Sequence, residues 1–154
     1  HPQQASAYPQ AVQAILGADL IVAGPGSLFT SVLPNLMVRD IASAIRSSRA
    51  LSVYVCNVAT QQGETDRFSV GQHIQILNAH TEGSLFPIVL ANNHCHGVLL
   101  PGMDWVTDGE NINGVGQVIS ADVLDEKAPW RHHSEKLASV LLRILKNGLP
   151  APKL

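Results

Sequence analysis

The sequence predicts an α/β fold in which helices cover the faces of a mostly parallel sheet. Short apolar runs without polar alternation, typical of strands buried on both faces, alternate along the chain with segments of helical periodicity. Parallel strands need crossover connections, and helices supply them. The 154 residues, 45% hydrophobic and 14% charged, have enough apolar mass for one compact domain.

The first elements illustrate these patterns. Apolar residues share one face of a helix predicted over residues 8–16, and the mainly apolar run 19–23 predicts a buried strand. Helical spacing resumes over residues 35–47, and we expect this helix to begin at or just after Pro34, because proline disfavours helix at the preceding residue.

The later elements follow the same patterns. A capping box, Ser69 with Gln72 three positions on, marks the start of one further helix. The remaining predictions are strands over residues 51–56, 86–91 and 117–123 and helices over residues 69–80 and 134–147.

Charge and composition exclude several classes of protein. A formal charge of −2 without any basic stripe argues against nucleic acid as a partner. No apolar stretch approaches the roughly 20 residues needed to span a bilayer, and the start lacks a signal-peptide profile. Cys56 and Cys95 are too few for a disulfide scaffold. We expect a soluble, cytoplasmic protein with reduced thiols.

The glycine-rich loop after the first predicted strand is the first candidate site. Pro25 and Gly26 suit the middle of a type II turn, after which the amides of residues 27–29 can point the same way and bind an anion. The alternative is a tight turn that its polar residues merely cap. The loop lacks the lysine of a Walker A motif. The phosphate- or nucleotide-binding candidates are Gly24, Gly26, Ser27, Leu28, Thr30, Ser31 and Asn35.

The loop over residues 57–66, after the second predicted strand, is the second candidate. Because the carboxyl ends of parallel strands meet at one sheet edge, both loops are expected to share a ligand. Glu64 and Asp66 are candidate ligands for Mg²⁺ or partners for ribose hydroxyls; the alternative is that Asp66 and Thr65 form solvated turns. The candidates here are Asn57, Thr60, Gln61, Gly63, Glu64, Thr65 and Asp66.

The histidines and cysteines carry weaker signals. His94 and His96 flank Cys95 and invite a zinc interpretation, but in an extended segment Cys95 faces away from both. We therefore interpret them as surface or interface residues. Cys56, at the end of an apolar strand, is expected to be a buried small hydrophobe. No catalytic residue is assigned, because Ser27 lacks the Gly-x-Ser-x-Gly pattern of a nucleophile elbow.

Four segments share a pattern with one known family. They are residues 18–36 with the Gly-Pro-Gly-Ser-Leu-Phe-Thr-Ser loop, residues 53–66 with Asn57 and Gly-Glu-Thr-Asp, and the closing segments 119–124 and 131–138. Together they resemble the YvcK proteins, called gluconeogenesis factors. These belong to the superfamily of the 2-phospho-L-lactate transferase CofD. The resemblance covers residues 11–145, and Gly26-Ser27 favours the YvcK branch over the Asn-Pro variant of CofD.

The resemblance implies a Rossmann-like three-layer sandwich that is half of a larger domain. Residues 1–148 are then a single α/β domain or the carboxyl-terminal part of a CofD-like domain, followed by a frayed tail over residues 149–154. It also implies a bacterial, cytoplasmic protein that binds a nucleotide or nucleotide sugar. Such proteins are linked to carbon metabolism, cell-wall synthesis and cell shape. We also expect a homo-oligomer.

Two functions follow from these observations. The first is a regulatory binding protein in which both loops bind a UDP-sugar-like ligand without chemistry, since no general base stands out. The alternative is a CofD-like transferase that moves a phospholactyl group from a nucleotide diphosphate carrier to an alcohol. In that case Glu64 or Asp66 would hold Mg²⁺, and positioning and charge neutralisation would supply most of the catalysis.

Overall fold

The computed structural model describes residues 5–107 and 116–148, in which one four-stranded sheet is found. The strands lie in the order β1-β2-β3-β4, and each neighbouring pair is parallel. They are β1 (Leu20–Ala23), β2 (Leu51–Val55), β3 (Ile88–Asn92) and β4 (Gln117–Ala121). The predicted parallel α/β fold is confirmed, and each strand overlaps its predicted range.

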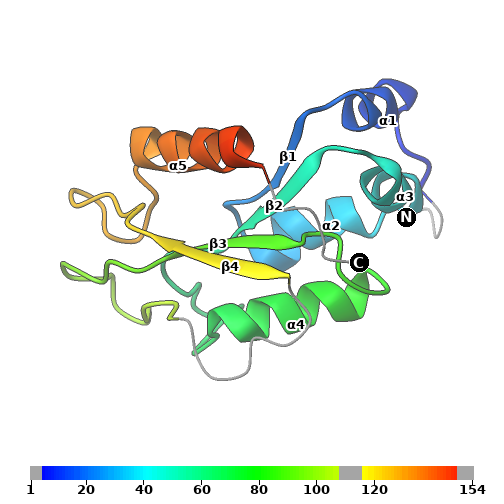
Figure 1. Ribbon diagram of the computed structural model, residues 1–154. Helices are drawn as coiled ribbons and strands as arrows, with labels where there is room; N and C mark the ends of the chain where they lie inside the picture. The colour runs from blue at the N-terminus through cyan, green and yellow to red at the C-terminus, as the bar shows by residue number, and fades with distance from the viewer. Residues whose placement is uncertain (1–4, 108–115, 149–154) are drawn as a thin grey trace.

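Helices cover both faces of the sheet and make three layers, as Figure 1 shows. Three helices pack on the face that carries Tyr54 and Val89, whereas one packs on the opposite face against Val53 and Leu90. The first group is α2 (Leu33–Leu36), α3 (Arg39–Ser47) and α4 (Val70–His80). The opposite face carries α5 (Ser134–Asn147), and α1 (Pro9–Leu16) contacts α3.

The region predicted as one helix over residues 35–47 is divided in two. A π-helical turn, η1 (Leu28–Val32), runs directly into α2, and Pro34 lies in the first turn of α2. Proline is tolerated there because its missing N–H would have no acceptor within the helix. The expectation that helix starts only at or after Pro34 is wrong, because η1 already supplies the helical turn that precedes it.

The start of α4 follows its sequence signal. The Ser69 hydroxyl accepts a hydrogen bond from the Gln72 amide at 3.3 Å, and the Gln72 side-chain oxygen accepts one from the Ser69 amide at 2.8 Å. The predicted capping box is confirmed, and it fixes where the chain leaves the second candidate loop.

The structure bears on the expected lack of membrane spans, whereas it does not describe the expected tail. The tail over residues 149–154 lies outside the described residues. Within the described part of the chain, no single helix has both the length and the apolar composition needed to cross a membrane. The bent pair Leu28–Leu36 and Arg39–Ser47 meets both criteria only when its members are counted together.

The turn after β1 differs from the predicted type II turn. That turn requires a positive φ at Gly26, but the positive φ, +84°, is at Gly24, and the Gly24–Pro25 peptide bond is cis. A Cβ atom on Gly24 would lie 2.7 Å from the Val55 carbonyl oxygen of β2. Glycine is therefore required at position 24 for two reasons: it adopts the positive φ, and it lets the two strands approach closely.

We predict that Gly24→Ala destabilises the protein by about 3 kcal/mol, because alanine adds both a left-handed backbone penalty and a contact with Val55. The matched control is Gly26→Ala, whose Cβ would meet the Ser31 side chain at ordinary contact distances, 3.4 Å from its Cβ and 4.0 Å from its Oγ. Urea unfolding followed by circular dichroism measures both. Equal stabilities for the two variants would contradict the role given to Gly24.

Candidate functional site

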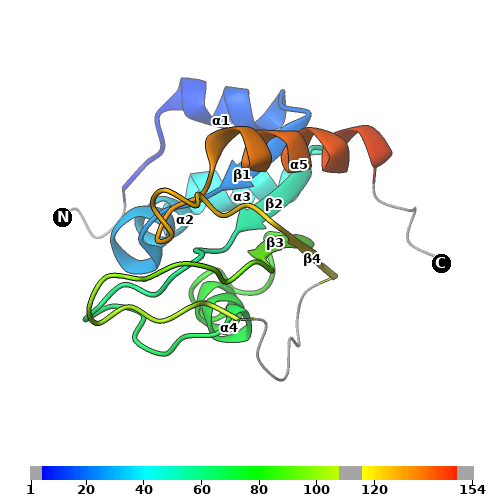
Figure 2. The same ribbon diagram turned by 90° about the vertical axis from the view of Figure 1, so that its left-hand side faces the viewer.

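Both candidate loops lie at the carboxyl-terminal edge of the sheet, which faces the viewer in Figure 2. The first follows β1 and the second follows β2, and these two strands are neighbours in the sheet. Their adjacency brings the loops together as the sequence predicts. Three sets of side chains hold the first loop: two connect it to the second loop, and one connects it to the start of α4.

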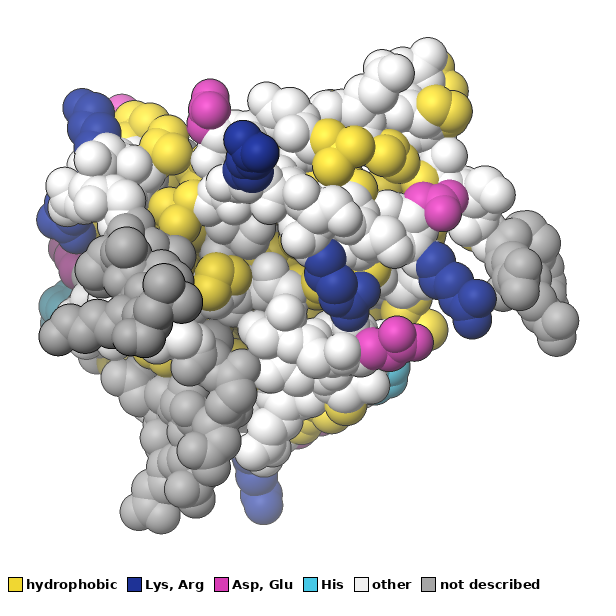
Figure 3. Space-filling model, turned by 45° about the vertical axis from the view of Figure 1, so that its right-hand side comes forward, with side chains coloured by type: hydrophobic (Ala, Val, Ile, Leu, Met, Phe, Trp, Pro, Cys, Tyr) yellow, Lys and Arg dark blue, Asp and Glu magenta, His cyan; other side chains and the backbone are white. Residues whose placement is uncertain are grey.

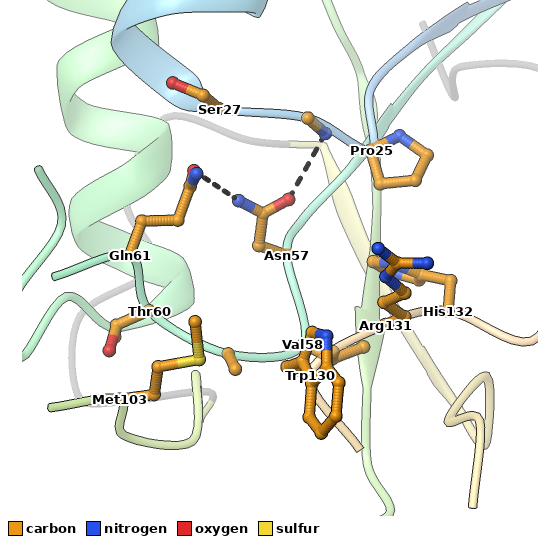
Figure 4. Close-up of a pocket in the computed structure, with 12 residues that line it drawn as sticks. Pro25, Ser27, Asn57, Val58, Thr60, Gln61, Met103, Trp130, Arg131 and His132 are labelled. Atoms are coloured by element: carbon orange, nitrogen blue, oxygen red, sulfur yellow. Dashed lines mark hydrogen bonds between the residues drawn. The ribbon is translucent and has the colours of Figure 1, made fainter. Parts of the chain in front are cut away.

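Asn57 makes the first connection. Its side-chain oxygen accepts a hydrogen bond from the Gly26 amide at 3.3 Å, and its side-chain nitrogen donates to the Gln61 side-chain oxygen at 3.4 Å (Figure 4). The Asn57 side chain thus contacts the backbone of the first loop at Gly26 and the side chain of Gln61 in its own loop. Asn57 holds the two loops at a fixed separation.

Ser27 makes the second connection. Its hydroxyl donates to the Glu64 carboxylate at 2.5 Å and accepts from the amide and hydroxyl of Thr30 at 3.0 and 2.6 Å. The Ser27 carbonyl accepts from the amides of Ser31 and Val32. A carboxylate therefore already lies at the start of η1, next to the expected anion-binding amides.

Aromatic rings make the third connection. Phe29 of the first loop lies edge-to-face with Phe68, at a centroid distance of 6.4 Å, and Phe68 lies edge-to-face with His73 of α4 at 5.6 Å. Such geometry is favourable for aromatic pairs. The apolar side of the first loop is thereby held against the start of α4.

Residues of both loops line one pocket of about 450 Å³, which we call the loop pocket (Figure 4). Residues 25–27 and 57–61 contribute from the two loops, and Met103 and residues 130–132 complete it. Trp130 adds a large aromatic surface, and the exposed Arg131 adds a permanent positive charge. The pocket combines amide and hydroxyl groups, an aromatic ring and a cation.

Sequence reasoning assigned no site role to Met103 or to residues 130–132. Two short antiparallel bridges bring them to the pocket: Ala59 pairs with Trp105, and Leu124 pairs with His132. In the first, Thr60 exchanges hydrogen bonds with the backbone of Asp104, at 2.9 and 2.8 Å. Residues 131 and 132 could have been predicted from the sequence, because they lie in the segment 131–138 that resembles the YvcK family.

His132 is fixed by the end of β2. Its Nε2 donates to the Cys56 carbonyl at 3.1 Å, since a carbonyl can only accept. Burial lowers the pKa of His132, and the bond to Cys56 offsets part of that effect. A neutral imidazole is the favoured form, and it ties the segment that carries Arg131 to the sheet. Cys56 is buried, as predicted.

The remaining candidates support the loops or lie elsewhere. Thr65 is fully buried, and its hydroxyl accepts from the Gln61 amide at 2.9 Å; Asp66 accepts from the Gly63 amide at 2.8 Å. Leu28 is buried in the core. The other candidates of the first loop lie toward the outer side of β1, where Gly24, Ser31 and Asn35 line a separate hollow.

The donor groups do not form a protein-only metal site. Glu64 is bonded to Ser27 and Asp66 to Gly63. In the described residues no three His, Cys, Asp or Glu side chains are grouped so that they could hold a metal ion. The rings of His94 and His96 lie 5.8 Å apart, and Cys95 between them is exposed.

Comparison with known proteins identifies the family. Residues 1–145 match the family described as 2-phospho-L-lactate transferase CofD. The chain belongs to the CofD family. The resemblance stated from the two loop motifs is thus confirmed.

Relatives of this CofD-family chain include gluconeogenesis factors from Listeria monocytogenes and Listeria innocua. These are 38% and 39% identical over 152 residues, and each match covers 95% of this chain and 47% of the relative. A crystal structure of a UPF0052 family member from Bacillus halodurans has 35% sequence identity and a TM-score of 0.81, covering 92% of this chain and 48% of its own. The chain spans about half the length of these relatives.

A buried histidine next to the second loop gives a pH-dependent prediction. His73 donates through Nδ1 to the Ser69 carbonyl at 2.9 Å, while its Nε2 is buried without a hydrogen-bond partner among the described residues. Burial lowers the pKa of His73, and the Ser69 bond offsets part of this. As pH falls below about 6.5, the unfolded chain binds protons that the folded protein does not.

Stability is therefore expected to fall between pH 7 and pH 5, by at most about 1.4 kcal/mol per pH unit for each of His73 and His132. His73→Leu should flatten this slope, and the control His80→Leu, on the exposed last turn of α4, should not. Urea unfolding across this range measures it. An unchanged slope in His73→Leu would show that His73 is not responsible.

Proposed function

We propose that this CofD-family chain contributes the loop pocket as a binding site for a nucleotide or a UDP-sugar-like nucleotide sugar. The observation that carries the proposal is the convergence of two polar loops, Trp130 and Arg131 around one pocket at the carboxyl edge of a parallel sheet. Open α/β sheets bind ligands at this edge. The volume of about 450 Å³ lies within the usual range of small-molecule pockets.

Each part of such a ligand has a matching group in the pocket. Arg131 suits a phosphate, because its guanidinium can make paired charge-assisted hydrogen bonds. Trp130 suits the flat face of a base or a sugar ring. Asn57 and Gln61 offer amide groups for sugar hydroxyls. Glu64 repels an anion near Ser27, so the phosphates are assigned to the Arg131 side of the pocket.

The proposed role is regulatory binding without chemistry. His132 is the one pocket histidine, and its Nε2–H is bonded to the Cys56 carbonyl. The link to carbon metabolism, cell-wall synthesis and cell shape, and a cytoplasmic location, are part of this proposal. Of these, the gluconeogenesis-factor names of the Listeria relatives support the link to carbon metabolism.

Calorimetry with UDP-N-acetylglucosamine tests the binding. Arg131→Ala should weaken it at least about tenfold, because a hydrogen bond to a charged group contributes about 1.5 to 3 kcal/mol. Gly26→Val and Ser27→Ala should also weaken it, since both residues line the pocket. The matched control is Arg143→Ala, on an exposed part of α5. Equal affinities for the protein and all its variants would end the proposal.

The transferase alternative is favoured by the CofD family match alone. It predicts Mg²⁺-dependent turnover of a nucleotide-linked phospholactate with an alcohol acceptor. Asp66→Asn and Glu64→Gln would both reduce that turnover if these carboxylates held the metal. We expect no turnover, because Glu64 accepts a hydrogen bond from the Ser27 hydroxyl and Asp66 accepts one from the Gly63 amide. Turnover that depends on either carboxylate, measured by product chromatography, would replace the binding proposal.

A further inference from the structure

A second hollow, about 460 Å³ in volume, lies between α3 and the end of α4, and we call it the helix hollow. Because α3 leads into β2 and α4 leads into β3, both helices end at the amino-terminal edge of the sheet, away from the loop pocket. Among the described residues, none lines both the loop pocket and the helix hollow. The helix hollow is therefore a separate place for a ligand.

Basic side chains surround the helix hollow. Arg39 and Arg46 reach it from α3, and His80 reaches it from the last turn of α4. Figure 3 shows basic side chains close to a histidine and an acidic side chain on the right of this face. The acidic residue of the lining is Glu82. Since the two arginines outnumber this one carboxylate, the helix hollow favours an anionic ligand.

Both arginine side chains have hydrogen-bond donors available. Within residues 5–107 and 116–148, no side-chain hydrogen bond or ion pair is found for Arg39, and the neighbouring Asp40 accepts a hydrogen bond from the Ala7 amide at 2.9 Å. Arg46 donates through Nη2 to the Thr81 carbonyl, which leaves most of its five N–H donors unused. A guanidinium with available donors can bind a phosphate through paired, charge-assisted hydrogen bonds.

The positions of the arginines on α3 keep their charges apart. Arg39 and Arg46 are seven residues apart, which places them two turns from each other on one face and separates their Cα atoms by about 10 Å. The bond to Thr81 holds the Arg46 guanidinium toward the end of α4. Between the arginines lie the small residues Ala42 and Ser43, and Ser43 is exposed. The helix hollow therefore suits a molecule with two separated anionic groups and a polar centre.

We propose that the helix hollow binds a small molecule with two phosphate groups, of the sugar bisphosphate class, with one phosphate at Arg39 and the other at Arg46. A carboxylate uses both of its oxygens on one guanidinium, whereas a phosphate keeps a third oxygen for a neighbouring donor such as Ser43. The two phosphates of a UDP-sugar are adjacent, so they do not match two charges separated by two helical turns. This second site goes beyond the function proposed for the loop pocket.

Calorimetry with fructose-1,6-bisphosphate tests the site, and fructose-6-phosphate is the comparison with a single phosphate. The bisphosphate is expected to bind at least about tenfold more tightly, because only the bisphosphate can contact both arginines at once. Equal affinities for the two sugars, or no binding of the bisphosphate, overturn the proposal. Tighter binding of the dicarboxylate adipate than of the bisphosphate also overturns it.

A pair of arginine variants locates the bound molecule. Arg39→Ala is expected to weaken binding of the bisphosphate at least about tenfold, because it removes hydrogen bonds to a charged group. Since Arg39 is exposed, the variant is expected to fold, which circular dichroism checks. The matched control, Arg49→Ala, removes an exposed arginine outside the lining and should have little effect. Equal losses in both variants would show only general attraction of charge and would overturn the site.

Glu82 provides a test of opposite sign. Glu82→Gln is expected to tighten binding of the bisphosphate severalfold, since it removes the carboxylate that repels a phosphate and keeps the size of the side chain. Unchanged or weaker binding in this variant would show that the bisphosphate lies outside the helix hollow.

Exchanging ligands and variants separates this inference from the proposed function. Arg39→Ala should leave binding of UDP-N-acetylglucosamine unchanged, and Arg131→Ala should leave binding of the bisphosphate unchanged. Bisphosphate binding that Arg131→Ala abolishes would place the bisphosphate in the loop pocket and overturn this inference alone. Bisphosphate binding that depends on Arg39, in a chain that does not bind UDP-N-acetylglucosamine, would support the helix hollow and end the proposed function.

Discussion

The close passage of Gly24 beside the Val55 carbonyl is the constraint on which the site depends. A Cβ atom there would lie 2.7 Å from that oxygen, so only glycine lets the end of β1 lie against the end of β2. From this approach the Gly26 amide comes within 3.3 Å of the Asn57 side chain. The loop pocket exists because two parallel strands end side by side and their loops turn in the same direction.

The residues of the loops divide into those that face the pocket and those that hold it. Asn57 and Gln61 line the pocket, whereas Thr65 and Asp66 accept hydrogen bonds from the amides of Gln61 and Gly63. Glu64 reaches across to Ser27. This division indicates that the carboxylates of Glu64 and Asp66 hold the loops in shape. The positive charge that would attract a ligand belongs to Arg131, which comes from a third segment of the chain.

Much of the fold could be predicted from the sequence because its signals are local. Apolar runs located all four strands, and the Ser69 capping box located α4. The turn at Gly24 was mispredicted, since the contact with Val55 that decides it is absent from the local sequence. Trp130 was missed for a similar reason: it reaches the pocket through a bridge between Leu124 and His132. Such pairings leave no periodic pattern.

A nuclear magnetic resonance titration of the chain with UDP-N-acetylglucosamine tests most directly whether the loop pocket binds a nucleotide sugar. We expect the largest shifts at the Gly26 amide, the Asn57 side-chain amide and the Trp130 indole N–H, which surround one pocket. Largest shifts around Arg39 and Arg46, at the hollow between α3 and the end of α4, would contradict it. An unchanged spectrum at a large molar excess of ligand would contradict it as well.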